Sequence, residues 1–229
     1  MNEYLCMRLA ATIKLPVPPV HLIQVPETVY IVQRYDRIVL GDTVRCLHQV
    51  DGCQLLGLGQ DWKYERQGLV SFKRIVEALR GLKLPAKDLL NFQRWVMFNY
   101  LIGNSDAHAK NISVLIDETG YALAPFYDLM CVQVYGDDRL ALFIGDEDQF
   151  ASIGAHSWEA FCEDCGFGVK PTLTLFRKMA NDVAKAWVAV TAQAMADFAP
   201  SPKEVALIHA ITKVIEANCL AAISMTAKR

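Results

Sequence analysis

Apolar residues recur every four positions near the start of the chain, and this period predicts a helix over Asn2–Leu15. A cluster of prolines follows directly and ends that helix. Two runs rich in β-branched residues then flank a Pro26-Glu27 turn, and they predict strands over Val20–Val25 and Thr28–Gln33. The chain therefore opens as a helix followed by a small hairpin.

The middle of the chain has mostly helical spacing. It predicts a short helix over Gln49–Leu58 and a second helix that Ser71 caps and that runs to Leu82. A longer helix over Asp88–Ile102 carries apolar residues on most of its faces, which is typical of a helix in the centre of a core. The Gly103-Asn104 pair that follows is a helix-end signature.

A compact β segment comes next. Asn111–Ile116 and Tyr121–Ala124 flank the polar turn Asp117-Glu118-Thr119-Gly120, an arrangement that predicts a β-hairpin. Arg139–Ile144 predicts a further strand.

The last part of the chain returns to helical spacing. Trp158–Cys165 predicts a short helix, and apolar steps of three and four from Phe176 to Ala194 predict a long one. Ser201-Pro202-Lys203-Glu204 is a capping box with proline at the first helical position, and it predicts the start of the last helix. The whole pattern predicts an α+β fold that is mostly helical, with a small β-containing front attached to a helical body.

Composition narrows the classes of function. The 229 residues suggest one domain or two small lobes that share a core, and 53% apolar residues exclude a disordered chain. The charge is balanced at 23 basic and 25 acidic residues, so no basic excess calls for nucleic acid. The chain has no run of 18 uncharged apolar residues and no secretory signal, so we expect a cytoplasmic protein without a membrane span. The seven cysteines are expected to be mostly reduced core residues.

Candidate chemistry concentrates between the central helix and the hairpin. Asp106 and Asn111 form an Asp-x-x-x-x-Asn pattern in the loop, and Asp128 follows the returning strand. Phosphoryl transfer requires a carboxylate to position the acceptor hydroxyl and oxygen ligands to hold Mg²⁺ against the phosphates. Asp106 has the chemistry of the first role, and Asn111 with Asp128 has that of the second.

A plainer interpretation stays open at this point. Asp, Asn, Gly and Ser are common in turns, and Asp106 is also a suitable turn cap. The presence of His108 and Lys110 in the same loop favours a site for metal and phosphate. The residues alone do not separate a kinase from a metal-dependent phosphohydrolase that uses the same Asp and Asn on water.

These motifs, taken in order, resemble the HipA family of serine/threonine protein kinases, the toxins of bacterial toxin–antitoxin pairs. The segments that carry the resemblance cover roughly residues 1–130 and read Asn2-Glu3-Tyr4-Leu5-Cys6-Met7-Arg8-Leu9-Ala10, Gln33-Arg34-Tyr35-Asp36-Arg37, His48-Gln49-Val50-Asp51-Gly52-Cys53-Gln54, Lys63-Tyr64-Glu65, Gly103-Asn104-Ser105-Asp106-Ala107-His108-Ala109-Lys110-Asn111-Ile112-Ser113 and Leu123-Ala124-Pro125-Phe126-Tyr127-Asp128. The resemblance implies a kinase fold related to the phosphatidylinositol kinases, seen here as a C-terminal lobe with an incomplete N-terminal lobe. Residues 1–40 would then form a remnant of the front lobe and the hinge, and residues 41–229 the helical body with the catalytic loop.

The resemblance also implies roles for individual residues. Asp106 would be the catalytic base, and Asn111 and Asp128 would hold Mg²⁺ beside ATP. The further residues implied to contact the nucleotide are Gln33, Arg34 and Tyr35 at the hinge, His108 and Lys110 near the phosphates, and Tyr127 next to Asp128. Glu3 is implied to be the acidic partner of a nucleotide-binding lysine.

Partners are implied in the same way. A HipA-type kinase phosphorylates serine or threonine on a protein, and aminoacyl-tRNA synthetases are the implied class of substrate. An antitoxin or a separate front-lobe subunit is the implied binding partner. The acidic segment Gly145-Asp146-Glu147-Asp148 speaks against direct contact with DNA.

The chain also departs from the family pattern. It lacks the glycine-rich cover and the lysine that a kinase holds over the phosphates, because Gly57 and Gly59 do not match that cover. We therefore expect a fragment, a truncated gene product or one half of a split kinase, and a catalytically inactive binding module is the alternative function. Separately, Cys162 and Cys165 have the spacing of a zinc pair, but they lack a second pair and are expected on one turn of a helix.

Overall fold

The computed structural model describes residues 1–118 and 120–226, so Thr119 of the expected hairpin turn lies outside the described residues. The helices are α1 (Asn2–Thr12), α2 (Gly52–Leu55), α3 (Phe72–Gly81), α4 (Ala86–Ile102), α5 (Ala155–Cys165), α6 (Val169–Phe198) and α7 (Pro202–Thr226). The strands are β1 (Val20–Val25), β2 (Glu27–Val32), β3 (Arg37–Leu40), β4 (Thr43–Cys46), β5 (His48–Asp51), β6 (Ser113–Asp117), β7 (Gly120–Leu123), β8 (Arg139–Ile144) and β9 (Glu147–Gln149). The short 3₁₀ helices are η1 (Gln60–Trp62), η2 (Glu65–Gln67), η3 (Ala109–Asn111), η4 (Gln133–Tyr135) and η5 (Phe150–Ser152). This element order confirms the expected α+β, mostly helical fold.

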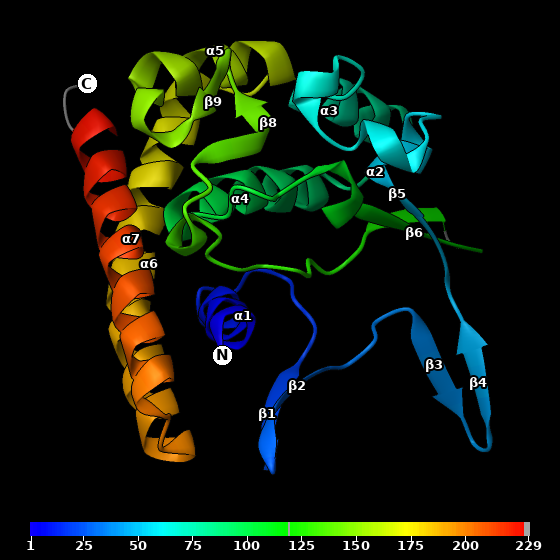
Figure 1. The fold of residues 1–229 in the computed structure, drawn as a ribbon. Helices are drawn as coiled ribbons and strands as arrows, with labels where there is room; N and C mark the ends of the chain where they lie inside the picture. Colours follow the sequence, from blue (N-terminus) through cyan, green and yellow to red (C-terminus); the bar gives the residue numbers. More distant parts are fainter. Residues whose placement is uncertain (119, 227–229) are drawn as a thin grey trace.

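Helix α4 is the centre of the body, with α6 and α7 side by side at one end and α1 beneath it (Figure 1). Its Trp95 is fully buried and stacks on Phe126 with ring centroids 5.8 Å apart. Such a pair contributes about 0.5–1.5 kcal/mol beyond its buried area. The contact ties the segment that leads to Asp128 directly to the core.

The three-stranded sheet has the order β5-β6-β7, and all its pairs are antiparallel. Asp51, the last residue of β5, pairs with Ser113, the first residue of β6. This edge of the sheet therefore lies next to η3, which precedes β6 in the chain. The sheet and α4 therefore hold the two sides of the loop that contains Asp106.

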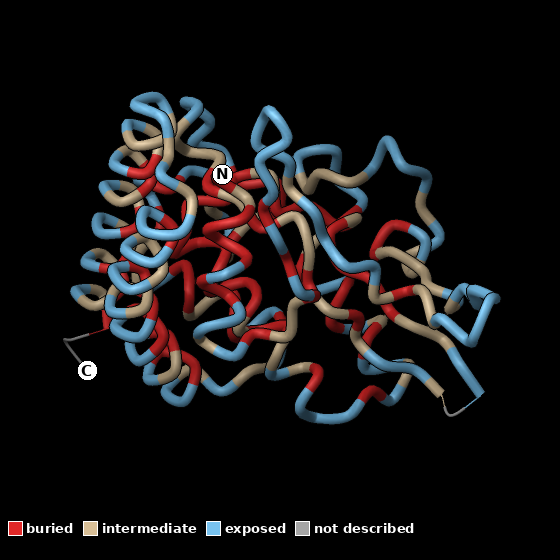
Figure 2. The backbone as a smooth tube through the Cα atoms, turned by 90° about the horizontal axis from the view of Figure 1, so that it is seen from below, coloured by how far each residue is buried: buried red, intermediate tan, exposed pale blue. Residues whose placement is uncertain are grey.

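The two front hairpins, β1–β2 and β3–β4, lie outside the buried centre that Figure 2 shows in red. Strand β1 buries Val20 and Leu22 on its inner side. The outer side of β1–β2 exposes Ile23, Val29 and Ile31. An apolar strand face that is open to solvent marks an interaction surface.

One helix of the described residues, α7, has the length and composition of a membrane-crossing helix, with a mean hydropathy of 1.5. Core helices have the same properties. Helix α7 buries Ile208, Ile211 and Ile215 and packs on α6 and α4, so part of its apolar surface is used within the chain. The expectation that the chain does not contact a membrane stays a prediction.

The capping residues were predicted correctly. The hydroxyl of Ser71 accepts the Arg74 N–H at 3.3 Å. At the start of α7, the carboxylate of Glu204 accepts the Ser201 N–H at 2.9 Å. These signals are local in sequence, which is why they transfer to the structure.

Three sequence-based elements need correction. The helix expected over Gln49–Leu58 is wrong in its first part, because β5 ends at Asp51 and only Gly52–Leu55 is helical. The strand expected from Asn111 begins at Ser113, since η3 occupies the preceding turn. The β3–β4 hairpin was not predicted. In each case a β-pairing partner or a turn, rather than local propensity, decides the conformation.

Candidate active site

Gly103 turns the chain from α4 into the loop of Asp106. Its φ of 70° is left-handed, and a Cβ there would lie 2.6 Å from Cγ1 of Val214. The Gly103 carbonyl accepts the N–H groups of Val132 and Gln133 at 2.9 and 3.0 Å. Glycine is therefore required here, and the loop is joined at its start to the segment that follows Asp128.

Asn111 connects the loop to Asp128. Its Oδ1 accepts the His108 N–H at 2.9 Å, and its Nδ2 donates to Oδ2 of Asp128 at 2.7 Å. The sequence predicts Asn111 as an oxygen ligand of Mg²⁺, whereas it is the amide nitrogen that faces Asp128. The oxygen keeps a second lone pair, since an amide oxygen accepts two hydrogen bonds.

Asp128 is held in an uncommon backbone conformation. Its φ is 58°, and its carbonyl accepts the Asn104 side-chain amide at 3.4 Å. Asn104 in turn donates to Oδ1 of the buried Asn99 on α4 at 2.8 Å. A left-handed aspartate costs about 1–2 kcal/mol, and the surrounding hydrogen bonds and the buried Phe126 offset this cost.

Asp106 is partly exposed, and its Oδ1 accepts the hydroxyl of Tyr64 at 2.9 Å. Within the described residues, Oδ2 of Asp106 has no hydrogen-bond partner. Tyr64 was recognised only as part of the Lys63-Tyr64-Glu65 motif, without a role. The sequence carries no signal for this contact, because 42 residues separate its partners.

His108 lies near both carboxylates. Burial lowers the pKa of His108, the charge of Lys63 lowers it further, and Asp106 and Asp128 oppose the shift. The lowered pKa favours the neutral imidazole. Its Nδ1 is buried and lacks a hydrogen-bond partner within residues 1–118 and 120–226.

Glu3 on α1 approaches the site from the other side. Burial raises the pKa of Glu3, and the charge of Asp128 raises it further. The charge of the Met1 amino group opposes this shift. Glu3 thus lies in the repulsive field of Asp128, which the N-terminal ammonium offsets only in part.

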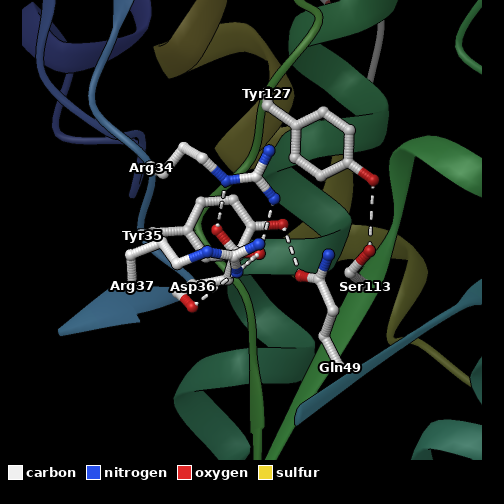
Figure 3. Close-up of polar contacts among 7 residues, drawn as sticks. All are labelled: Arg34, Tyr35, Asp36, Arg37, Gln49, Ser113 and Tyr127. Carbon is white, nitrogen blue, oxygen red and sulfur yellow. Dashed lines mark hydrogen bonds and ion pairs between the residues drawn. The ribbon is translucent and has the colours of Figure 1, made fainter. Parts of the chain in front are cut away.

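The expected hinge lines a pocket of about 240 Å³ with Tyr127. Arg34 and Arg37 both contact the buried Asp36, and Arg34 keeps the pKa of this carboxyl low (Figure 3). The Arg34 side chain is thus engaged with Asp36, and no contact places it at the loop of Asp106.

The two tyrosines of this pocket stack with ring centroids 6.0 Å apart. The hydroxyl of Tyr35 donates to Gln49 at 2.9 Å (Figure 3). The hydroxyl of Tyr127 donates to the Lys110 carbonyl at 2.6 Å. Since this bond uses the Tyr127 proton, the Ser113 hydroxyl donates to the Tyr127 oxygen at 3.1 Å (Figure 3). The hinge and the loop of Asp106 are therefore linked through Tyr127.

Lys110 is engaged elsewhere. Its Nζ lies 2.5 Å from Oδ2 of Asp51, the residue that caps α2. This contact raises the pKa of Lys110. A role for Lys110 beside the phosphates would require this ion pair to open or to be shared.

The donor set fits a hard cation. Mg²⁺ prefers oxygen ligands and takes one or two carboxylates. Asp128 retains an Oδ1 without a partner among the described residues, and Asn111 retains a lone pair. No group of three or more His, Cys, Asp or Glu side chains that could hold a metal occurs in the described part of the chain. Cys162 and Cys165 are buried in α5, which confirms that they lie on one helix.

Comparisons with known proteins identify relatives of this chain. The family model described as the HipA-like C-terminal domain matches residues 1–187. The chain is 36% identical over 190 residues to Y4mE of Sinorhizobium fredii, a protein with a provisional kinase name. This alignment includes 81% of the present chain and 45% of Y4mE. It is 32% identical over 203 residues to the serine/threonine-protein kinase toxin HipA of Shewanella oneidensis, covering 47% of that protein with 81% of its own length.

Solved structures give the same result. The HipA chain in a complex of Shewanella oneidensis HipA, HipB and operator DNA superimposes with a TM-score of 0.92 and 27% identity, over 99% of this chain and 56% of that one. The Helicobacter pylori proinflammatory kinase CtkA shares the fold, with a TM-score of 0.65 and 12% identity over 99% of this chain and 83% of that one. The presence of operator DNA in the first complex gives no support to the expectation that this chain avoids nucleic acid.

The chain spans about half the length of the curated relatives it matches. The matched family model covers most of the chain, and the motifs that carry the resemblance lie within it. The chain belongs to the family of HipA-like C-terminal domains.

Proposed function

We propose that this chain is the body of a HipA-type serine/threonine protein kinase that uses ATP and Mg²⁺. The observation that carries the proposal is the hydrogen-bond network in which Asn111 joins the Asp106 loop to Asp128. Phosphoryl transfer depends on positioning and on charge stabilisation, so a preformed link between the base and the metal ligand is the feature it requires.

In this proposal Asp106 accepts the proton of the acceptor hydroxyl through Oδ2. Asn111 and Asp128 hold Mg²⁺, which when bound neutralises charge on the phosphates. The repulsion between Glu3 and Asp128, which the Met1 ammonium offsets only in part, supports a cation here, because a further positive charge near them relieves it. The same reasoning supports a nucleotide-binding lysine opposite Glu3, supplied by other residues.

Adenine is proposed to bind at the hinge pocket. The Gln33 N–H is used by the Pro19 carbonyl at 3.0 Å. The Gln33 carbonyl and the Tyr35 N–H have no partner within the described residues, so one acceptor and one donor are available to a base edge. His108 is proposed to contact the phosphates through its buried, unpartnered Nδ1.

The outer side of β1–β2 is proposed to bind further strands of a front lobe, whether they belong to the same polypeptide or to another. Its exposed Ile23, Val29 and Ile31 are suited to packing beneath such strands. An antitoxin is a second proposed partner, since the Shewanella relative was solved with HipB. The proposed substrate is a serine or threonine of a cytoplasmic protein, with aminoacyl-tRNA synthetases as the class implied by the family.

The test is transfer of the γ-phosphoryl group from labelled ATP to protein. The chain is assayed alone and with a polypeptide that corresponds to the part of Shewanella HipA outside the superposition. We expect transfer with Mg²⁺, none with EDTA and none with Asp106→Asn. Binding of Mg²⁺-ATP without any transfer would instead identify the catalytically inactive module.

A further inference from the structure

Tyr64 lies against the proposed base although it belongs to a different part of the chain. It stands between η1 and η2, and its hydroxyl donates to Oδ1 of Asp106 at 2.9 Å. The roles assigned above to Asp106, Asn111 and Asp128 do not use this contact.

Tyr64 is held in place through the backbone on both sides. The carbonyl of Lys63 accepts the Ala109 N–H at 3.2 Å, which ties this segment to the loop of Asp106. The carboxylate of Glu65 accepts the Phe143 N–H at 2.6 Å, which ties it to β8. The Tyr64 N–H donates to Oε1 of Gln67 at 3.1 Å and closes the turn. The hydroxyl therefore approaches Asp106 from a fixed position.

The ring of Tyr64 is also surrounded. The edge of His108 meets it with centroids 5.7 Å apart and an interplanar angle of 77°. Lys63 Nζ and the guanidinium carbon of Arg66 lie 4.8 and 4.4 Å from the ring centroid. Cation–ring contacts of this kind restrict the ring further.

We propose that Tyr64 is a positioning residue for Asp106, an inference that rests on the proposed kinase function. The terminal torsion of an aspartate is broad, so an isolated carboxylate samples many orientations. A hydroxyl fixed on Oδ1 selects one orientation and leaves Oδ2 facing the acceptor. Tyr64 keeps its proton throughout, and the acceptor proton goes to Oδ2.

The opposite role for this contact is a gate. If the Tyr64 hydroxyl stood where the acceptor hydroxyl must bind, its removal would raise turnover. The free Oδ2 favours positioning, and so do the three hydrogen bonds around Tyr64, because a gate has to move away while these bonds hold its segment in place.

The experiment compares Tyr64→Phe, which removes only the hydroxyl, with Tyr121→Phe on the exposed part of β7. Phosphoryl transfer is measured with the chain and the added Shewanella HipA polypeptide, and the KM for ATP is determined in the same assay. We expect kcat to fall about tenfold or more in Tyr64→Phe, with the KM for ATP within about twofold, since misplaced reacting groups slow the chemical step. Tyr121→Phe should match the wild type.

Two outcomes overturn the inference while leaving the kinase function intact. A kcat within about twofold of the wild type shows that the hydroxyl has only a structural role, and a raised kcat shows a gate. Wild-type protein that transfers nothing overturns the proposed function, and the positioning role falls with it. A melting curve of Tyr64→Phe confirms that the assayed protein is folded.

Discussion

Nδ2 of Asn111 donates a 2.7 Å hydrogen bond to Oδ2 of Asp128, joining two residues that are 17 positions apart. This bond orients the Asp128 carboxylate and leaves its Oδ1 without a partner among the described residues. One oxygen is therefore held by the protein, and the other is available to the Mg²⁺ that we propose.

Asp128→Asn should abolish the thermal stabilisation that Mg²⁺-ATP gives to the protein. A ligand at a hundredfold excess over its Kd contributes about 2.7 kcal/mol, and an amide binds Mg²⁺ far less well than a carboxylate. Asn also tolerates the left-handed φ of 58°, so the backbone is not the cause of any change. Melting curves with and without Mg²⁺-ATP measure the effect.

The matched control is Asp42→Asn, in the exposed turn between β3 and β4. It should retain the full ligand-induced shift. Equal losses in both variants would show that Asp128 does not hold the metal.

Asp106→Gln and Asn111→Ala should differ in kind. A base acts mainly in the transition state, so Asp106→Gln should lower kcat at least about a hundredfold and leave the affinity for ATP unchanged. Asn111→Ala should damage both, because it removes a metal ligand and releases Asp128. Labelled phosphate transfer and calorimetric ATP binding are measured side by side. Turnover of Asp106→Gln within about threefold of the wild type would remove Asp106 from the role of base.

Stability should fall as the pH rises toward neutrality because of Glu65. Burial raises the pKa of Glu65 from 4.5 to about 7, although its bond to the Phe143 N–H opposes the shift. Between these values the folded protein binds more protons than the unfolded chain, so the free energy of unfolding decreases with pH. The slope from one group is at most about 1.4 kcal/mol per pH unit.

Glu65→Gln should remove this decrease, since its amide oxygen still accepts the Phe143 N–H without a charge. Urea unfolding from about pH 5 to about pH 8 measures the difference from the wild type. Glu77→Gln on the exposed side of α3 serves as the control and should keep the wild-type slope. Parallel curves for the wild type and Glu65→Gln would show that Glu65 does not titrate in this range.

Gly103→Ala should destabilise the protein by about 2–4 kcal/mol, from a left-handed φ and from overpacking. The new Cβ would lie 2.6 Å from Val214 Cγ1. Gly136→Ala has a similar φ of 86° but nothing within 4 Å, so it should cost only about 1 kcal/mol. Urea unfolding of both variants separates the two contributions, and equal losses would contradict the close approach of α7.

Val29→Lys should prevent docking of front-lobe strands on β1–β2 without lowering the melting temperature. Val29 is 42% exposed, so a charge there disturbs little within the chain. Val188→Lys, at a position on α6 that is 67% exposed, is the matched control. Calorimetry with the remaining part of Shewanella HipA measures binding, and unchanged affinity in Val29→Lys would place the docking surface elsewhere.

Local patterns in the chain were sufficient for most of its helices, for their caps and for the spacing of Asp106 and Asn111 in their loop. Helix ends depend on residues within a few positions of each other, so they can be predicted without knowing the fold. Examples are Ser71, Gly103 and the Ser201–Glu204 capping box. The order of the family motifs likewise placed Asp106, Asn111 and Asp128 in one candidate site. The hydrogen bond between Asn111 and Asp128, by contrast, depends on how Asn111 turns its amide.

The remaining features arise from partners that are distant in sequence. Gln49 is a strand residue because it pairs with Leu115 of β6. The spacing of apolar residues near Gln49 does not reveal this distant pairing. The charge of Asp128 acts on Glu3 across the body, and Tyr64 contacts Asp106 across 42 residues. Packing of α1 on α6 and of η2 on β8 brings these residues near each other. The physical origin of this proximity is the burial of apolar surface, which brings polar side chains together without leaving a pattern among neighbouring residues.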